Sequence, residues 1–279
     1  MAYRTRTRRS ASSFFAGMSL TNSIIFVNVA VFLIYWIAAV FSNSLWSYIF
    51  LTPSLLFSGY FWTLITSMFL HVWVFHLFVN MFSLFFLGNF LERIIGRKRF
   101  FWVYIISGAI GGLFFAAFTY IGLYIPRGDF LFGIPSASAI GASGALFGLV
   151  GVLALLVPYK KVYFLAGPLL LIILQFVFIN VLPVPLQTPV SVAITVLLFL
   201  MIFSIFSTNR MLRSLALPLQ LSFWAVPIVA IIPLFIIGFF VDLPIGNTAH
   251  LGGLVVGLVY GAYLRMKYAR KVALLNRLI

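Results

Sequence analysis

Cysteine is absent from this chain of 279 residues, and only three residues are Asp or Glu. Without cysteine the chain has no disulfide, no thiolate metal site and no cysteine nucleophile. Charged residues of both signs make up only 8% of the chain. That share excludes an ordinary soluble domain, in which about a quarter of the residues are charged. Histidine is also scarce, with three in the chain, so the position of each one is informative.

The abundant class is the apolar one, at 64% of the residues. These residues fall in long runs separated by short polar segments, which is typical of a polytopic membrane protein. The 18 Lys and Arg residues lie in the short segments. They therefore indicate membrane topology rather than nucleic-acid binding. The sequence has no long polar segment, so we expect no second, soluble domain.

Eight apolar runs come close to the roughly 20 residues that a membrane-spanning helix needs. They cover about 22–41, 64–90, 101–121, 139–157, 162–182, 190–206, 215–241 and 247–266. Residues 42–62 are uncharged and aromatic, which predicts a loop lying in the membrane interface. Three prolines in 215–241 predict kinks. The expected fold is an all-α polytopic membrane bundle of eight helices.

The expected organisation is a basic N-terminal segment, 1–20, a transmembrane domain, 21–268, and a basic tail, 269–279. The N-terminal segment is rich in Arg and Ser and has no acid, which fits either a transit peptide or a cytoplasmic anchor; we favour the anchor. The apolar run that follows is too long for the core of a cleaved signal peptide.

The basic residues test the helix count. With eight helices, 17 of the 18 Lys and Arg residues fall on the side shared by both termini, and Arg127 lies on the other side. A wrong helix count would scramble this asymmetry. We therefore expect both termini in the cytoplasm. A prokaryotic cell membrane is the expected location, with an organelle membrane as the alternative.

Five polar residues occupy corresponding places in three of these helices. They are His71, His76 and Asn80 in the second apolar run, Ser143 in the fourth and His250 in the eighth. All three helices enter from the non-cytoplasmic side, so these side chains are expected in one leaflet at similar depth. Polar groups inside a membrane are costly and usually face a partner or a cavity. The coincidence indicates one functional site.

The residue types in this group suit acyl transfer. A serine hydroxyl is a weak nucleophile until a base removes its proton, and neutral imidazole is the usual base. Ser143 and His250 fit these roles. Attack on a peptide carbonyl creates an oxyanion that needs preorganised donors. His76 and Asn80 are four residues apart, hence on one helix face, and both can donate. The Ser143 backbone N–H is a further donor.

Glycines predict how the helices of Ser143 and His250 approach each other. The first helix carries Gly144, Gly148 and Gly151, and the second carries Gly253, Gly257 and Gly261. Such faces of small residues allow backbones to come close in lipid. Phe147, one turn below Ser143, is expected to pack against the His250 ring.

Each of these signals has a plainer alternative. A Gly-Ala-Ser-Gly-Ala run in a membrane helix is often only a packing surface, and a histidine can be a buried hydrogen-bond donor. The His76 and Asn80 pair would then tie its helix to its neighbours. Asn247 is expected to be a helix N-cap rather than a catalytic group. His71 is expected on another face of its helix, in a packing role.

Three stretches taken together resemble the motifs of the rhomboid intramembrane serine proteases. They are Gly141-x-Ser143-Gly144, His76-x-x-x-Asn80 and Ala249-His250-x-x-Gly253. The resemblance implies a Ser–His dyad, with Ser143 as nucleophile and His250 as base, and an oxyanion hole from His76, Asn80 and the Ser143 amide. Supporting roles are expected for Gly141, Gly144, Phe147, Asn247, Gly253 and Gly257. No cofactor and no metal are implied.

The resemblance also assigns parts of the fold. It makes 42–62 the family's interfacial loop and 215–241 its mobile substrate gate. Many members have Trp-Arg in that loop where this chain has Trp62-Thr63. Minimal bacterial members have six helices, so 162–182 and 190–206 are expected to be an extra pair. Because the pair adds an even number of crossings, His250 still faces Ser143.

Other functions fail on the residues or remain as alternatives. A zinc protease needs a His-Glu-x-x-His helix, which the sequence lacks. An aspartyl protease needs two intramembrane aspartates, whereas Asp129 and Asp242 fall in loops. A transporter would show an inverted repeat of broken helices. The remaining alternative is a rhomboid-like pseudoenzyme that binds or escorts membrane helices. The expected partner is a membrane protein with a single transmembrane helix, in a lipid bilayer, and no nucleic acid.

Overall fold

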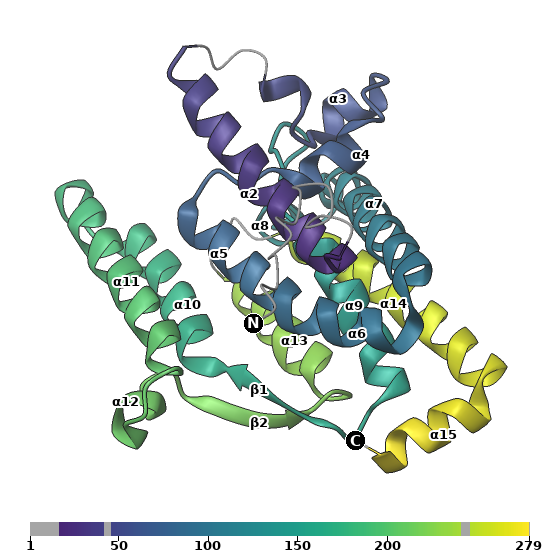
Figure 1. The fold of residues 1–279 in the computed structure, drawn as a ribbon. Helices are drawn as coiled ribbons and strands as arrows, with labels where there is room; N and C mark the ends of the chain where they lie inside the picture. The colour runs from purple at the N-terminus through teal and green to yellow at the C-terminus, as the bar shows by residue number, and fades with distance from the viewer. Residues whose placement is uncertain (1–16, 42–45, 241–245, 279) are drawn as a thin grey trace, which may run out of the picture.

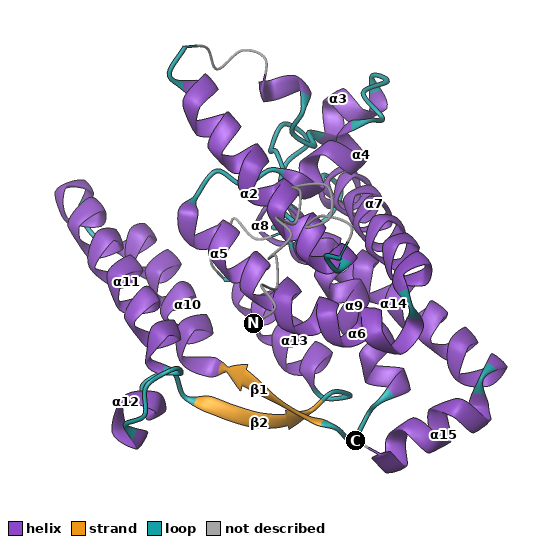
Figure 2. Cartoon of the chain, in the orientation of Figure 1, coloured by secondary structure: helices purple, strands orange, loops and turns teal. Residues whose placement is uncertain are grey.

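The computed structural model describes residues 17–41, 46–240 and 246–278. Arg4, Arg6, Arg8, Arg9 and Asp242, on which the sequence predictions drew, lie outside them. The apolar helices form a bundle, and a hairpin of two helices stands to one side of it (Figure 1). A two-stranded ribbon joins this hairpin to the bundle and is the only sheet in the part described (Figure 2).

Every predicted membrane helix has a helical counterpart. Four segments are long and apolar enough to cross a membrane: α2 (Leu20–Ala39), α5 to α6 (Val74–Ile95), α7 (Arg97–Gly122) and α11 (Val184–Ser204). The other four are α9 (Ser143–Leu156), α10 (Ala166–Val181), α13 (Val226–Gly238) and α14 (Asn247–Lys267). The predicted all-α bundle is confirmed, apart from the small ribbon.

The centre of the bundle is α9, which packs between α7 and α14 and is largely buried. A Cβ added to Gly253 would collide with the carbonyl oxygen of Gly144, and one added to Gly257 with that of Gly148. The two backbones therefore touch directly, which only glycine permits. The predicted close approach of these two helices is confirmed.

The second predicted helix, 64–90, begins and ends later in the structure, at Val74 and Ile95. Residues 63–69 form two single turns, α4 (Thr63–Thr66) and the 3₁₀ turn η2 (Ser67–Phe69), and Leu70 and Trp73 are extended. Thr66 Oγ1 donates to the Ile49 carbonyl at 2.8 Å, which ties the segment to the preceding loop instead of a helix. The regular helix starts with α5 (Val74–Ser83) and continues through a π-helical turn, η3 (Leu84–Gly88), into α6 (Asn89–Ile95).

Residues 162–165 and 218–222 fall near the starts of two predicted helices, 162–182 and 215–241, and lie in strands instead. β1 (Lys161–Leu165) and β2 (Pro218–Ser222) pair antiparallel, with Lys161 opposite Ser222. Aromatic and β-branched residues, as in β1, suit strands, and Pro218 is tolerated at the first position of β2. The apolar composition misled the prediction, because a short apolar run fits either structure.

The hairpin of α10 and α11 corresponds to the predicted extra pair. α11 starts earlier than expected, because Pro185 lies in its first turn, where proline is tolerated. Phenylalanines of α11 pack on phenylalanines of α5, with ring centroids 5.3 Å apart for Phe75 and Phe199 and 5.6 Å apart for Phe78 and Phe203. The hairpin therefore rests against the helix that carries His76 and Asn80.

The interfacial segment before α5, residues 46–62, is held by hydrogen bonds to the chain before α9 and by hydrogen bonds within itself. It contains the 3₁₀ turn η1 (Trp46–Tyr48) and α3 (Pro53–Phe57), and residues 42–45 lie outside the description. The Leu51 and Ala139 backbones exchange two hydrogen bonds, of 3.2 and 2.8 Å. The Trp62 indole donates to the Tyr48 carbonyl at 2.8 Å. The loop thus fixes the chain four residues before Ser143.

Three further helices are short or peripheral. α8 (Gly128–Phe132) follows α7, and α12 (Arg210–Ser214) precedes β2. The basic tail forms α15 (Ala269–Leu278), which folds back so that Asn276 Nδ2 donates to the Leu156 carbonyl at 2.7 Å. Residues of the predicted tail therefore contact the end of α9.

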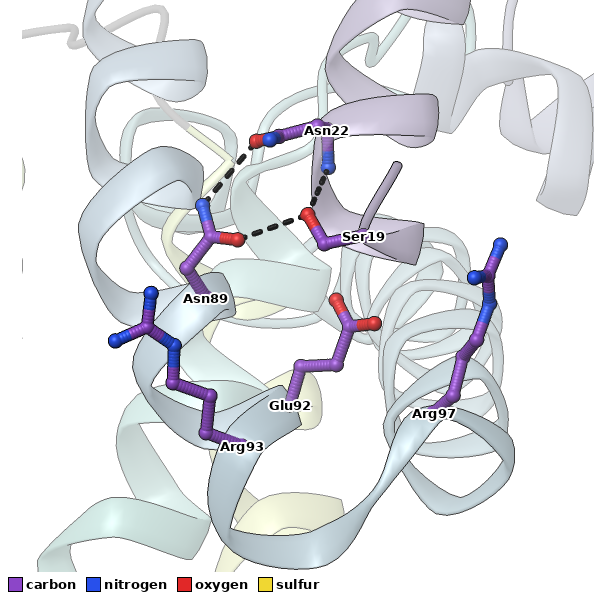
Figure 3. A pocket seen from close by; sticks show the side chains of 6 residues that line it. All are labelled: Ser19, Asn22, Asn89, Glu92, Arg93 and Arg97. Atoms are coloured by element: carbon purple, nitrogen blue, oxygen red, sulfur yellow. Dashed lines mark hydrogen bonds between the residues drawn. The ribbon is translucent and has the colours of Figure 1, made fainter. Parts of the chain in front are cut away.

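The only glutamate in the chain joins α6 to α2 (Figure 3). Glu92 accepts hydrogen bonds from the Leu20 N–H at 2.9 Å, the Thr21 N–H at 2.8 Å and Thr21 Oγ1 at 2.7 Å. It satisfies donors that the start of α2 would otherwise leave unpaired. Beside it lies a polar cavity of about 340 Å³, lined by Ser19, Asn22, Asn89, Glu92, Arg93 and Arg97.

Candidate active site

Ser143 is the first residue of α9. The predicted helix, 139–157, placed it about one turn inside, so the helix starts later than predicted. The preceding backbone explains the later start. Gly141 has φ +110°, a left-handed conformation that breaks the helix and favours glycine. Its N–H donates to the Ser67 carbonyl at 2.8 Å. The chain is therefore turned into α9 by a fixed, non-helical segment.

His250 lies against Ser143. Its Nε2 is 2.8 Å from Ser143 Oγ, although 107 residues separate the two in sequence. His250 is the fourth residue of α14, as predicted, and only 8% of its surface is exposed. The Phe147 ring stacks on the imidazole with centroids 4.5 Å apart and planes 19° apart, so the predicted contact is confirmed. The glycine contact between α9 and α14 brings the hydroxyl and the imidazole within hydrogen-bond distance.

His76 and Asn80 lie on one face of α5, beside the turn that leads to Ser143. A Cβ built on Gly141 would be 2.7 Å from His76 Cε1 and 3.6 Å from Asn80 Nδ2. Gly141 therefore leaves the space that the two side chains fill. Both residue types can donate hydrogen bonds, and both side chains lie near the start of α9. The first backbone N–H groups of that helix, Ser143's included, have no partner within the helix itself.

His71 belongs to this cluster, contrary to the prediction that it faces elsewhere. Residues 70–73 are not helical, so helical spacing from His76 does not apply to His71. His71 is fully buried, its Nε2 is 3.1 Å from Asn80 Nδ2, and its ring centroid is 4.9 Å from that of His76. The scarcity of histidine, with all three in the motif segments, was the signal that could have identified it.

Asn247 has a different place from the one predicted. The N-cap of α14 is Gly246, and Asn247 is the first helical residue. Its side chain is buried, and Nδ2 lies 3.4 Å from the Leu234 carbonyl of α13. Because the amide is turned toward α13, it does not cap its own helix. Across the described residues, no group of three His, Asp or Glu side chains is arranged to hold a metal ion.

Comparison with known proteins identifies the same group of proteins as the motifs. Residues 58–193 match the model of the Rhomboid domain. This match contains His71, His76, Asn80 and Ser143 and ends before α14, so His250 lies outside it.

Relatives of known name share part of the chain. The provisionally named rhomboid protease YdcA of Bacillus subtilis is 37% identical over 105 residues, which is 37% of this chain and 45% of the relative. RHOMBOID-like protein 1 of Arabidopsis thaliana is 40% identical over 90 residues, 32% of this chain and 19% of the relative. Inactive RHOMBOID-like protein 8 of the same plant is 37% identical over 90 residues, 32% and 21% respectively.

The similarity therefore covers less than half the length of each of these relatives. One of them is named as a protease and another as inactive. Members of this family are integral membrane proteins, which agrees with the four apolar helices long enough to cross a bilayer. The domain match and the named relatives lead to one assignment: residues 58–193 of this chain carry a Rhomboid domain.

Proposed function

We propose that this chain is an intramembrane serine endopeptidase that cleaves transmembrane segments of other membrane proteins. The observation that carries the proposal is the 2.8 Å contact between Ser143 Oγ and His250 Nε2. A serine hydroxyl becomes nucleophilic when an imidazole accepts its proton. Phe147 holds the ring plane from one side, which fixes the imidazole toward the hydroxyl.

The reaction follows from these positions. His250 Nε2 accepts the Ser143 proton as Oγ attacks the scissile carbonyl carbon, and the carbonyl oxygen becomes an oxyanion. His76, Asn80 and the Ser143 amide are the donors proposed for it. The imidazolium then gives its proton to the leaving amine. Water, activated in turn by His250, releases the acyl group from Ser143 and restores the free hydroxyl.

The depth of Ser143 supports a substrate that lies in the membrane. α9 has 14 residues. At 1.5 Å per residue it is about 21 Å long, which is shorter than the roughly 30 Å of the hydrocarbon core. A helix this short leaves its first residue recessed below one membrane surface. We propose that the substrate is a single transmembrane helix that unwinds near its outer end and is cut beside a small residue.

The supporting glycines allow the helices and side chains of the site to approach each other closely. Gly253 and Gly257 let α14 approach α9, and Gly141 leaves room for the His76 ring. Gly144 lies beside this contact, with its carbonyl oxygen against Gly253. Asn247 links α14 to α13, the helix proposed to move as the substrate gate. These residues set the geometry of the dyad and do not touch the substrate bond.

The orientation of the domain is part of the proposal. We propose a transmembrane domain over 21–268 with basic flanks at 1–20 and 269–279, and with both termini in the cytoplasm. The basic asymmetry of the loops supports this orientation. The site would then open on the non-cytoplasmic side, where the starts of α5, α9 and α14 meet.

The test is a cleavage time course with purified protein in liposomes and a model single-span substrate, paired with labelling by a fluorophosphonate probe. We expect cleavage and labelling by the natural sequence and loss of both in Ser143→Ala. Folding of each variant is checked by its tryptophan fluorescence melting curve. If folded protein neither cleaves nor labels but still retains the substrate on co-purification, the pseudoenzyme is the correct alternative.

A further inference from the structure

The Asn80 amide has no hydrogen left for an oxyanion in this structure. Its Nδ2 lies 3.1 Å from His71 Nε2 and 3.1 Å from the His76 carbonyl oxygen. A primary amide nitrogen carries two hydrogens. One hydrogen goes to each of these acceptors, so both are already used.

The orientation of this amide follows from the same two contacts. If its oxygen and nitrogen were exchanged, Oδ1 would lie 3.1 Å from the His76 carbonyl oxygen, where two acceptors would repel. The nitrogen must therefore face both partners. His71 Nε2 is then the acceptor, and the His71 proton is on Nδ1.

The two hydrogen bonds of the Asn80 amide differ in how easily they can be broken. The bond to the His76 carbonyl lies within α5 and spans four residues, so it moves with the helix. The bond to His71 comes from the extended segment before α5, and His71 is fully buried there. An oxyanion can take an Asn80 hydrogen only if the bond to His71 is given up.

We propose that His71 is a positioning residue that holds the Asn80 amide at rest and releases one of its hydrogens when the oxyanion forms. The inference rests on the proposed protease function. A neutral N–H···N bond is exchanged for a charge-assisted N–H···O⁻ bond, which is stronger. The exchange favours the transition state and not the uncharged substrate carbonyl, so it acts on kcat.

A double-mutant cycle tests this coupling in liposomes with the model substrate. Asn80→Ala should lower kcat by about 10²–10³-fold, the usual effect of losing one oxyanion donor. His71→Leu keeps an apolar volume but no acceptor, so the Asn80 amide is no longer held in the orientation from which it donates. This loss of positioning should lower kcat about tenfold, with KM within about twofold. The double variant should be no worse than Asn80→Ala, since His71 acts through that amide.

His71→Gln is the matched control, because its side-chain oxygen can still accept from Asn80. It should restore most of the activity that His71→Leu loses. A purely structural His71 would instead give effects that add to those of Asn80→Ala, with Gln no better than Leu. Either of those two results overturns the proposal.

A structure of the unmodified chain with a peptide phosphonate on Ser143 avoids any dependence on how the variants fold. We expect Asn80 Nδ2 within hydrogen-bond distance of the phosphonyl oxygen, and a His71 to Asn80 separation beyond 3.5 Å. A His71 contact that stays at hydrogen-bond length overturns the release step. Failure of the phosphonate to react with Ser143 would instead contradict the proposed function itself, so the two failures are distinguishable.

Discussion

The contact between Gly253 of α14 and the backbone of α9 gives a specific prediction. Gly253 lies three residues after His250, and its missing side chain faces the carbonyl oxygen of Gly144, the residue after Ser143. In Gly253→Ala the added methyl would lie far inside van der Waals contact with that oxygen. Both atoms belong to helix backbones or are fixed to them, so neither can rotate away. α14 must retreat from α9.

The expected size of the effect follows from this geometry. Overpacking a closed interface costs roughly 1–3 kcal/mol of folding stability. The retreat also lengthens the 2.8 Å contact between Ser143 Oγ and His250 Nε2. A displacement of about 1 Å in a reacting group costs about 10²-fold in rate. We therefore expect a lower melting temperature and a loss of kcat of about that size, because the dyad no longer aligns.

The assay compares tryptophan fluorescence melting with cleavage of the model substrate in liposomes. Gly246→Ala is the control at the start of the same helix, where the new Cβ would make an ordinary 3.5 Å contact with Ala249. Because Gly246 is the N-cap of α14, where alanine is less favourable than glycine, this control should lower the melting temperature less than Gly253→Ala does, and it should keep its activity. If Gly253→Ala matched the unmodified chain in both measurements, the role of the glycine contact in aligning the dyad would be refuted.

Three further predictions concern other parts of the chain. Ser143→Ala, His250→Ala and the double variant should lose cleavage equally, because nucleophile and base act as a unit; a double variant clearly worse than either would contradict this. Glu92→Gln should lower the melting temperature with little change in activity per folded molecule, because three donors lose a charged acceptor worth about 1.5–3 kcal/mol per bond; Asp129→Asn serves as the control. Alanine at both Gln175 and Asn180 should leave cleavage within a few-fold, because the Asn180 amide bonds only within α10, to Phe176; a loss as large as that of Ser143→Ala would show that the hairpin contributes to the site.

Much of the bundle follows from simple physical regularities. Apolar length located the eight helices, since each must satisfy its backbone hydrogen bonds within itself in lipid. Glycine spacing predicted the contact between α9 and α14, because small residues alone allow backbones to touch. The stacking of Phe147 on His250 followed from helical spacing. In each case the pattern that led to the prediction lies within a single helix.

The errors have a different cause. β1 and β2 pair with each other across more than fifty residues, and neither shows its partner in its own sequence. Short apolar strands and helix ends have similar compositions, so periodicity could not separate them. The correct start of α11 was missed for a related reason: proline disfavours a helix interior, yet Pro185 fits the first turn and α11 also contains Pro189 in its interior.

The environment of the site depends on irregular, non-helical segments, which hydrophobic periodicity cannot predict. Gly141 is fixed by the Ser67 carbonyl, and Ala139 by the Leu51 backbone, so the turn into Ser143 is set by the interfacial loop. His71 reaches Asn80 because the residues before α5 are extended. Irregular backbone at membrane depth needs partners from elsewhere in the protein. Such segments hold polar groups where a regular helix would turn them away. The motif residues could therefore be found from the sequence, whereas the group that holds Asn80 at rest required the three-dimensional structure.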